Sequence, residues 1–189
     1  MKQSLGAKPL LYPTPVVVVG TYDSHDKPNI ATLAWVGICN SKPPCIAFSI
    51  GKGKHTHSNI VERKAFTVNI PSKKHIKETD YIGIVSGKKV DKFAATKLTP
   101  VKSDLVDAPY VSEFPLVLEC KLLQTIEIGD HAQFIGEILD VKADDSVLEK
   151  DLPDVKKVDP ILLVPETWLY YGVGSYLGKA FSIGKEIST

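Results

Sequence analysis

A basic stretch between an apolar run and a helical pattern carries side chains that could bind an anion. It includes Lys52, Lys54, His55, Thr56 and His57. The first N–H groups of a helix have no partner within that helix and carry partial positive charge. Because Thr56 is suited to cap a helix here, the stretch predicts an anion site, most often one for phosphate. Taken alone, such charges more often form a solvated loop; the position at a helix start favours the anion site.

Several motifs for nucleotide, acyl or metal chemistry are absent from the sequence. It has no G-x-G-x-x-G turn, no Walker A loop and no G-x-S-x-G elbow. The pair His55 and His57 lacks an obvious third ligand nearby, so we expect no metal site. Any nucleotide-like cofactor must therefore be held by a different geometry.

One more histidine and a set of aromatic residues could contact a ligand. His131 follows the turn residues Gly129 and Asp130, where it could donate a proton or a hydrogen bond near neutral pH. The alternative is a turn residue that satisfies its own backbone. Aromatic side chains could flank a planar ligand, or could belong to the core or a subunit interface. They are Trp35, Trp168, Tyr170, Tyr171 and Tyr176.

The composition predicts one ordinary globular domain spanning residues 1–189. Hydrophobic residues make up 43% and charged residues 24%, and the net charge is +1. This balance gives no general attraction to nucleic acid or to a membrane surface, and the apolar runs are too short to cross a bilayer. Pro9 and Pro13 interrupt the N-terminal segment, so we expect no secretory signal and a cytoplasmic location.

The cysteines indicate buried thiols rather than a disulfide framework. The chain has three, Cys39, Cys45 and Cys120, an odd number at wide spacing. Cys45 and Cys120 lie within apolar strand patterns, as buried cysteines commonly do. Cys39 is expected near a loop beside the ligand surface, where a small inert residue and a redox role both stay open.

The elements that must position these residues are mostly short strands. Alternating or continuous apolar runs separated by Pro- and Gly-containing turns predict a mainly β, split antiparallel barrel of Greek-key type with a few short peripheral helices. The expected strands are Val16–Tyr22, Asn29–Gly37, Cys45–Ile50, Phe66–Ile70, Leu116–Ile128, Ala132–Val141 and Trp168–Val173. Helices are expected from Thr56 to Lys64 and over Lys74–Ile82, with one further helical turn within Ser86–Thr99.

Ten short segments, in this order and spacing, resemble the flavin reductase-like family, which includes the flavoredoxins. The segments are Pro15–Val17, Asn29–Trp35, Ser41–Pro44, Lys54–Ile60, Phe66–Pro71, Ser86–Gly87, Asp91–Phe93, Gly129–His131, Ile135–Glu137 and Tyr170–Gly172. The resemblance implies an FMN-binding split β-barrel and a homodimer, with FMN at or near the subunit interface.

The resemblance also implies roles for particular residues. Four residues would follow the isoalloxazine edge of FMN: Thr32, Leu33, Ala34 and Trp35. Three would follow its pyrimidine side and ribityl chain: Ser49, Ile50 and Gly51. Four would reach its phosphate: Lys54, His55, Thr56 and Lys92. His131 would face the nicotinamide or substrate side. Many relatives that resemble flavoredoxin carry an arginine where this chain has Thr14, and often a serine where it has Ala34. Both changes leave backbone contacts to FMN possible.

The implied activity is electron transfer through FMN from NAD(P)H or a redox protein to an acceptor. One alternative is a non-enzymatic FMN electron carrier of the flavoredoxin kind. Another is a barrel that has lost its flavin and serves as a binding or structural protein.

Overall fold

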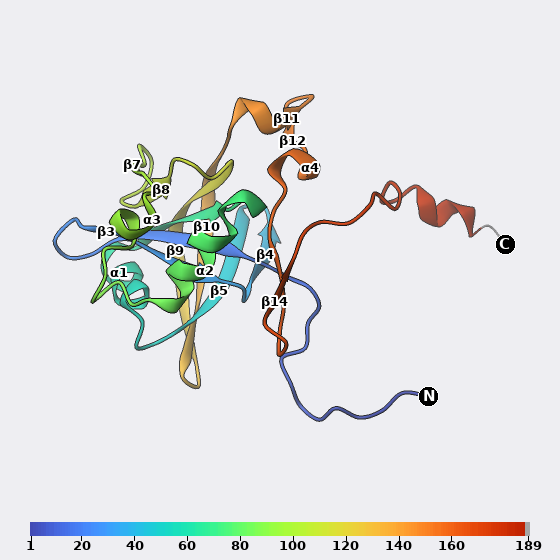
Figure 1. Cartoon of the computed structure of the whole chain (residues 1–189), viewed down its shortest axis with the longest axis horizontal. Helices are drawn as coiled ribbons and strands as arrows, with labels where there is room; N and C mark the ends of the chain where they lie inside the picture. Colours follow the sequence, from blue (N-terminus) through green and yellow to red (C-terminus); the bar gives the residue numbers. More distant parts are fainter. Residues whose placement is uncertain (188–189) are drawn as a thin grey trace.

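A seven-stranded antiparallel sheet forms the body of the computed structural model, which describes residues 1–187 (Figure 1). Its strand order is β3-β2-β6-β9-β10-β5-β4. The strands are β2 (Val17–Tyr22), β3 (Pro28–Leu33), β4 (Val36–Ser41), β5 (Pro44–Gly51), β6 (Ala65–Ile70), β9 (Leu116–Ile128) and β10 (His131–Ala143). The fold is mainly β with antiparallel strands, as the sequence predicted.

The sheet curves into a barrel whose two edge strands, β3 and β4, are neighbours in the chain. Only Ala34 and Trp35 separate β3 from β4, so the opposite edges of the sheet must lie near each other. No ladder joins these two edges among the described residues, and the barrel is therefore split between them. The carbonyl of Trp35 instead accepts a hydrogen bond from the amide of Ser49 on β5, at 2.9 Å.

Smaller elements surround the barrel. The helices are α1 (His55–Arg63), α2 (Ile76–Ile84), α3 (Lys92–Thr96) and α4 (Val155–Val158), with 3-10 turns η1 (Lys73–His75), η2 (Asp145–Val147) and η3 (Ile183–Glu186). A three-stranded sheet combines β1 (Thr14–Pro15), β13 (Leu162–Val164) and β14 (Leu169–Tyr171). Two hairpins complete the set: β7 (Pro100–Lys102) with β8 (Pro109–Val111), and β11 (Leu148–Glu149) with β12 (Leu152–Pro153).

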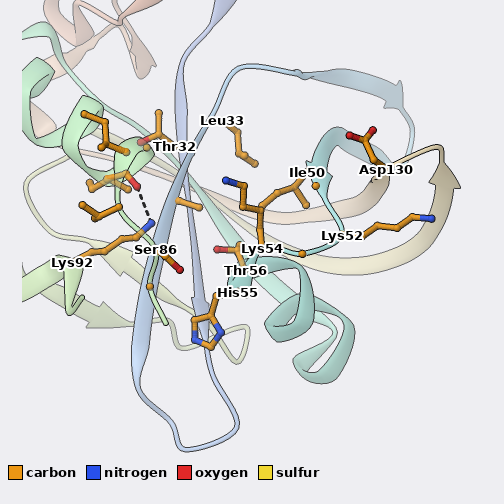
Figure 2. Close-up of a pocket in the computed structure, with 18 residues that line it drawn as sticks. Thr32, Leu33, Ile50, Lys52, Lys54, His55, Thr56, Ser86, Lys92 and Asp130 are labelled. Carbon is orange, nitrogen blue, oxygen red and sulfur yellow. Dashed lines mark hydrogen bonds between the residues drawn. The ribbon is translucent and has the colours of Figure 1, made fainter. Parts of the chain in front are cut away.

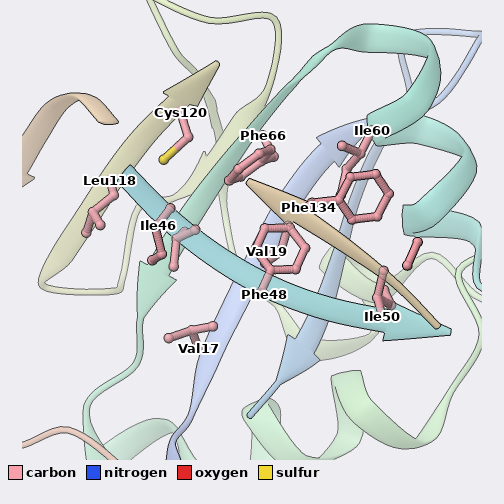
Figure 3. Close-up of a cluster of buried hydrophobic side chains, with 12 residues drawn as sticks. Val17, Val19, Ile46, Phe48, Ile50, Ile60, Phe66, Leu118, Cys120 and Phe134 are labelled. Carbon is pink, nitrogen blue, oxygen red and sulfur yellow. The ribbon is translucent and has the colours of Figure 1, made fainter. Parts of the chain in front are cut away.

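The barrel core is built around three phenylalanines (Figure 3). Phe48 and Phe66 meet edge to face with ring centroids 5.0 Å apart, and Phe134 lies 5.7 Å from Phe48. All three are fully buried, and each such side chain contributes roughly 1.5–3 kcal/mol by leaving water. A Cβ on Gly136 would lie only 2.3 Å from the Phe66 ring, so this position on β10 accepts no side chain without repacking.

The expected runs correspond to β2, β3, β5, β6, β9, β10 and β14, whereas the short strands β1, β7, β8, β11, β12 and β13 were not predicted. The run expected as a single strand, Asn29–Gly37, is divided between β3 and β4. The apolar pattern continues through Ala34 and Trp35 while the chain crosses between the two edges of the barrel. The helical turn expected within Ser86–Thr99 is confirmed as α3, which Asp91 caps by accepting a hydrogen bond from the Ala94 amide at 3.1 Å. Cys45 and Cys120 are buried, as expected, and Cys39 is exposed on β4.

Both ends of the described chain extend away from the barrel (Figure 1). We call residues 1–13 the N-terminal arm and residues 172–187 the C-terminal arm. Their large apolar side chains are exposed: Leu5, Leu11, Tyr12, Tyr176, Leu177, Phe181, Ile183 and Ile187. Phe181, for example, is 97% exposed, which is a costly position for a side chain of this size. None of the described helices is both long and apolar enough to span a bilayer.

Candidate functional site

Two adjoining cavities lie along β3, beside the start of α1, and Figure 2 shows the residues that line the first of them. The first, which we call the polar cavity, has a volume of about 540 Å³ and lies between the turn 51–56, the segment 82–87 and Lys92. The second, the apolar chamber, has about 470 Å³ and lies between β3, α2 and β14. Both are lined by Thr32, Leu33, Ile50, Gly51, Lys54, Gly83 and Ile84. The two spaces therefore form one continuous site.

The N-terminus of α1 presents free N–H groups at the polar cavity. The helix begins at His55 with Lys54 as its N-cap, so the expectation that Thr56 caps the helix was wrong. The amides of Lys54 and His57 bond to the carbonyls of Gly51 and Lys54, at 3.0 and 3.1 Å. The amides of His55 and Thr56 have no partner among the described residues, as expected for the first turn of a helix.

Thr56 has a structural partner that leaves its hydroxyl proton available. The Asn29 side-chain amide donates to Thr56 Oγ1 at 2.9 Å, and Asn59 donates to Thr21 Oγ1 at 3.0 Å in the same buried group. Because Thr56 accepts in this contact, its own O–H proton can be donated elsewhere. Thr56 lines the polar cavity, so a ligand there could receive that hydrogen bond.

Lys92 supplies a buried cation to the same cavity. The residue is only 6% exposed, and its Nζ donates to the carbonyl of Ile82 at 2.7 Å. Burial, together with the charge of Lys54, lowers the pKa of Lys92 to about 8. An ammonium has three N–H donors, and this one has a single partner among the described residues. A bound anion would satisfy the remaining donors and restore the pKa.

The other basic residues of the turn are already engaged. Lys52 points away from the cavity centre (Figure 2) and pairs with Glu127 at 2.7 Å. His55 Nε2 lies 3.8 Å from the carboxylate of Asp23, although the residue also lines the polar cavity. The His57 ring packs against Phe134 at 5.3 Å between centroids. The positive charge at the cavity therefore comes mainly from Lys54 and Lys92.

The apolar chamber is lined by residues that include Thr32 and His131. Thr32 Oγ1 donates to the Thr79 carbonyl of α2 at 2.5 Å, so this hydroxyl is committed to the fold. His131 opens β10 opposite Gly51, and its Nδ1 lies 2.8 Å from Asp130 Oδ1. This hydrogen bond lowers the pKa of the Asp130 carboxyl. It also orients the imidazole at the mouth of the chamber.

All of the residues to which the family resemblance assigned a role line one or both cavities, whereas the candidates His57, Tyr171 and Tyr176 line neither. Those of the polar cavity are Thr32, Leu33, Ile50, Gly51, Lys54, His55, Thr56 and Lys92; the chamber adds Ala34, Trp35, Ser49 and His131. Sequence reasoning predicted a helix over Lys74–Ile82 but did not assign to the site the residues that α2 and the segment after it supply: Asp80, Gly83, Ile84 and Ser86. No local pattern marks these residues, because α2 meets β3 only through the tertiary fold. Among residues 1–187 no cluster of three metal-ligating side chains occurs.

Comparison with known proteins gives a consistent result. The flavin reductase like domain model matches residues 10–172. A solved structure of flavoredoxin from Desulfovibrio vulgaris (Miyazaki F) is 54% identical, with 98% of this chain and 100% of that chain covered and a TM-score of 0.94. A flavoredoxin from Methanosarcina acetivorans is 34% identical, with 100% and 98% covered and a TM-score of 0.91.

A more distant structure shares the fold alone. An FMN-binding protein from Thermus thermophilus is 21% identical, with 95% of this chain and 98% of that chain covered and a TM-score of 0.79. The family model covers most of the chain, and the two flavoredoxins align over nearly their full lengths. This chain therefore belongs to the flavin reductase-like family.

Proposed function

We propose that the chain is an FMN-binding oxidoreductase, acting as one domain, that passes electrons from NAD(P)H or a redox protein through FMN to an acceptor. The observation that carries the proposal is the buried Lys92 ammonium beside the free N–H groups of α1, in a cavity that opens into an apolar chamber. This combination fits a molecule with a charged tail and a flat apolar ring. The names of the similar flavoredoxins and of the more distant FMN-binding protein support FMN as that molecule.

The polar cavity fits the phosphate of FMN. Lys54 and Lys92 would offset its charge, Thr56 would donate its hydroxyl proton, and the amides of His55 and Thr56 would donate from the helix N-terminus. His55 would assist from the edge of the site. These groups come from two elements, α1 and α3, so the phosphate would connect them.

The chamber fits the ring. Main-chain groups of Thr32–Trp35 and Ser49–Gly51 would follow its edge. Bound FMN would supply the redox chemistry, while the protein supplies binding, orientation and the electrostatic environment. His131, oriented by Asp130, would align the nicotinamide of an electron donor against the ring.

A second candidate function is a non-enzymatic FMN electron carrier. The 54% identity to a flavoredoxin favours it. The two candidates differ in how the reduced state forms. An enzyme would oxidise NADH or NADPH rapidly, whereas a carrier would keep its yellow colour through purification and react poorly with both nucleotides.

We also propose that two copies of the chain form a homodimer. A groove of about 700 Å³ lies between residues 8–15 and Trp35–Cys39, and it shares Ala34, Trp35 and Ser49 with the apolar chamber. The exposed apolar residues of the two arms could cover such a groove on a second copy. The ring of FMN would then lie close to the subunit interface, and Cys39 would lie within it.

The decisive experiment is the visible spectrum of the purified protein, followed by titration of the flavin-stripped protein with FMN. We expect a flavin absorption band that is saturable by FMN. Anaerobic addition of NADH and NADPH, separately, then distinguishes enzyme from carrier by the rate of bleaching. A protein that gains no flavin band after incubation with FMN would refute the proposal and favour a barrel that has lost its flavin.

A further inference from the structure

A carboxylate lies in the wall of the apolar chamber and has no role in holding FMN as proposed above. Asp80 belongs to α2 and is half-buried. Its Oδ1 accepts a hydrogen bond from the Tyr170 hydroxyl of β14 at 2.9 Å. Burial raises the pKa of that tyrosine to about 12, and the contact with Asp80 adds to the effect. The hydroxyl therefore keeps its proton and keeps donating it to Asp80.

The second oxygen of Asp80 is available to a ligand. Within residues 1–187, Oδ2 makes no hydrogen bond, and it is not among the buried polar atoms that lack a partner. No lysine, arginine or histidine of these residues forms an ion pair with Asp80. The carboxylate is therefore part of the chamber wall without an ion-pair partner, and the other charged or titratable side chains of that wall, besides Tyr170, are Lys54 and His131.

The surroundings of Asp80 determine which ligand groups it favours. Apolar side chains share the chamber wall with Asp80, among them Val16, Ile84 and Leu163. In such surroundings a group that donates an N–H or O–H to the carboxylate gains a charge-assisted hydrogen bond. A ligand carboxylate at the same place meets a like charge and loses part of its own hydration. The chamber thus distinguishes ligands by the substituent that faces Asp80.

We propose that Asp80, held in position by Tyr170, is a specificity-determining residue that selects a second reactant bearing a neutral hydrogen-bond donor, such as a primary carboxamide on a planar ring, over one bearing a carboxylate. The inference rests on the proposed binding of FMN, because the second reactant must lie beside the flavin ring in this chamber.

Two variants separate the charge of Asp80 from its structural contact. Asp80→Asn keeps the size of the side chain and an oxygen that can accept from Tyr170, but removes the charge. Tyr170→Phe removes the hydrogen bond between α2 and β14 and leaves the charge. Glu78→Gln is the matched control, because it removes one negative charge from the same helix at a position outside both cavities.

The probes are nicotinamide and nicotinate, which differ only in a carboxamide against a carboxylate. Their dissociation constants would be measured with FMN-loaded protein from the perturbation of the flavin absorption band. We expect the native chain to prefer nicotinamide at least tenfold. Asp80→Asn should reduce this preference about tenfold, mainly by improving nicotinate binding, since one removed like-charge contact is worth about 1.4 kcal/mol or more. Tyr170→Phe should keep most of the preference, and Glu78→Gln all of it.

Each other result counts against the inference in a distinct way. If FMN binds but Asp80→Asn leaves the nicotinamide-to-nicotinate ratio unchanged, the role of Asp80 is refuted while the proposed function stands. If Tyr170→Phe abolishes the preference and Asp80→Asn does not, the contact between α2 and β14 explains the preference, and selection by charge is refuted. If the native chain does not bind FMN, the proposed function fails and this inference fails with it.

Discussion

Lys92 is the residue on which anion binding at the site most depends, because it is a buried cation with one neutral partner. Lys92→Met should weaken FMN binding about 10- to 100-fold, the effect of losing a hydrogen bond between charged groups. The flavin-free protein should be as stable as before or more stable, since a buried charge is removed. Fluorescence titration and thermal unfolding measure the two effects, and Lys52→Met, whose amine pairs with Glu127, is the control.

The same residue predicts a pH dependence. The pKa of Lys92 is about 8 in the folded chain against an ordinary value of 10.5, so between these values the unfolded chain holds more protons. The unfolding free energy of the flavin-free protein should therefore gain a rising contribution between pH 8 and 10.5. A bound phosphate would raise the pKa, so FMN affinity should fall as the pH rises above 8. Neither trend should persist in Lys92→Met; an identical pH profile in that variant would contradict the assignment.

A substitution at His131 tests the role that we propose for the apolar chamber. His131→Asn should slow reduction of bound FMN by NAD(P)H by about 10- to 100-fold, since alignment of a reactant contributes strongly to rate. FMN affinity should not change, because the residue lies outside the polar cavity. Stopped-flow absorbance gives the rate. Equal rates in the native chain and the variant would remove His131 from the mechanism.

At the scale of elements, strands β9 and β10 depend on an ion pair outside the barrel core. Glu119 is fully buried, and its Oε2 accepts from Lys142 at 2.7 Å, while Oε1 has no partner among the described residues. Lys142→Met should lower the unfolding free energy by about 2–3 kcal/mol, because it leaves a buried carboxylate without its cation.

Denaturant unfolding would measure this loss. Adding Glu119→Gln to Lys142→Met should recover part of the stability, since the remaining group is then neutral. A double variant less stable than Lys142→Met alone would show that the carboxylate is stabilised by something other than the lysine.

Local patterns in the sequence predicted the elements whose signals are local. Strand β6 ends before Pro71, as the sequence predicted, and α3 lies within Ser86–Thr99, where the sequence predicted a helical turn. The break between β3 and β4 was missed because Ala34 and Trp35 carry no turn signal. Lys54 was missed as the helix N-cap because it makes no side-chain capping bond, and Thr56 accepts from Asn29 instead.

The residues of the candidate site also differ in whether local sequence patterns could predict them. Its turn and strand residues could be proposed from the sequence because they are adjacent along the chain. Asp80 and Tyr170 could not be paired in advance, since 90 residues separate them and only the packing of α2 against β14 brings them together.

At the scale of the whole molecule, the arms determine the oligomeric state that we propose. The double variant Leu177→Ser, Phe181→Ser removes two exposed apolar side chains from the C-terminal arm. It should shift the homodimer toward monomer by at least tenfold in dissociation constant, since each buried side chain of this kind contributes roughly 1.5–3 kcal/mol. Sedimentation equilibrium measures the shift.

Leu152→Ser is the control for the arms, because Leu152 is an exposed apolar residue on β12 rather than in either arm. It should leave the association unchanged. An arm variant that associates as tightly as the native chain would place the interface elsewhere.

The gap between β3 and β4 has a consequence for how the family can diverge. Each edge strand of the sheet has one row of peptide N–H and C=O groups that pair with no neighbouring strand, and the end of β3 lines the chamber. Hydrogen bonds from peptide groups to a ligand depend on the position of the backbone and not on which side chains it carries. A substitution at Ala34, which lies between β3 and β4 and lines the chamber, would therefore change a side chain beside the chamber and leave the peptide groups in place.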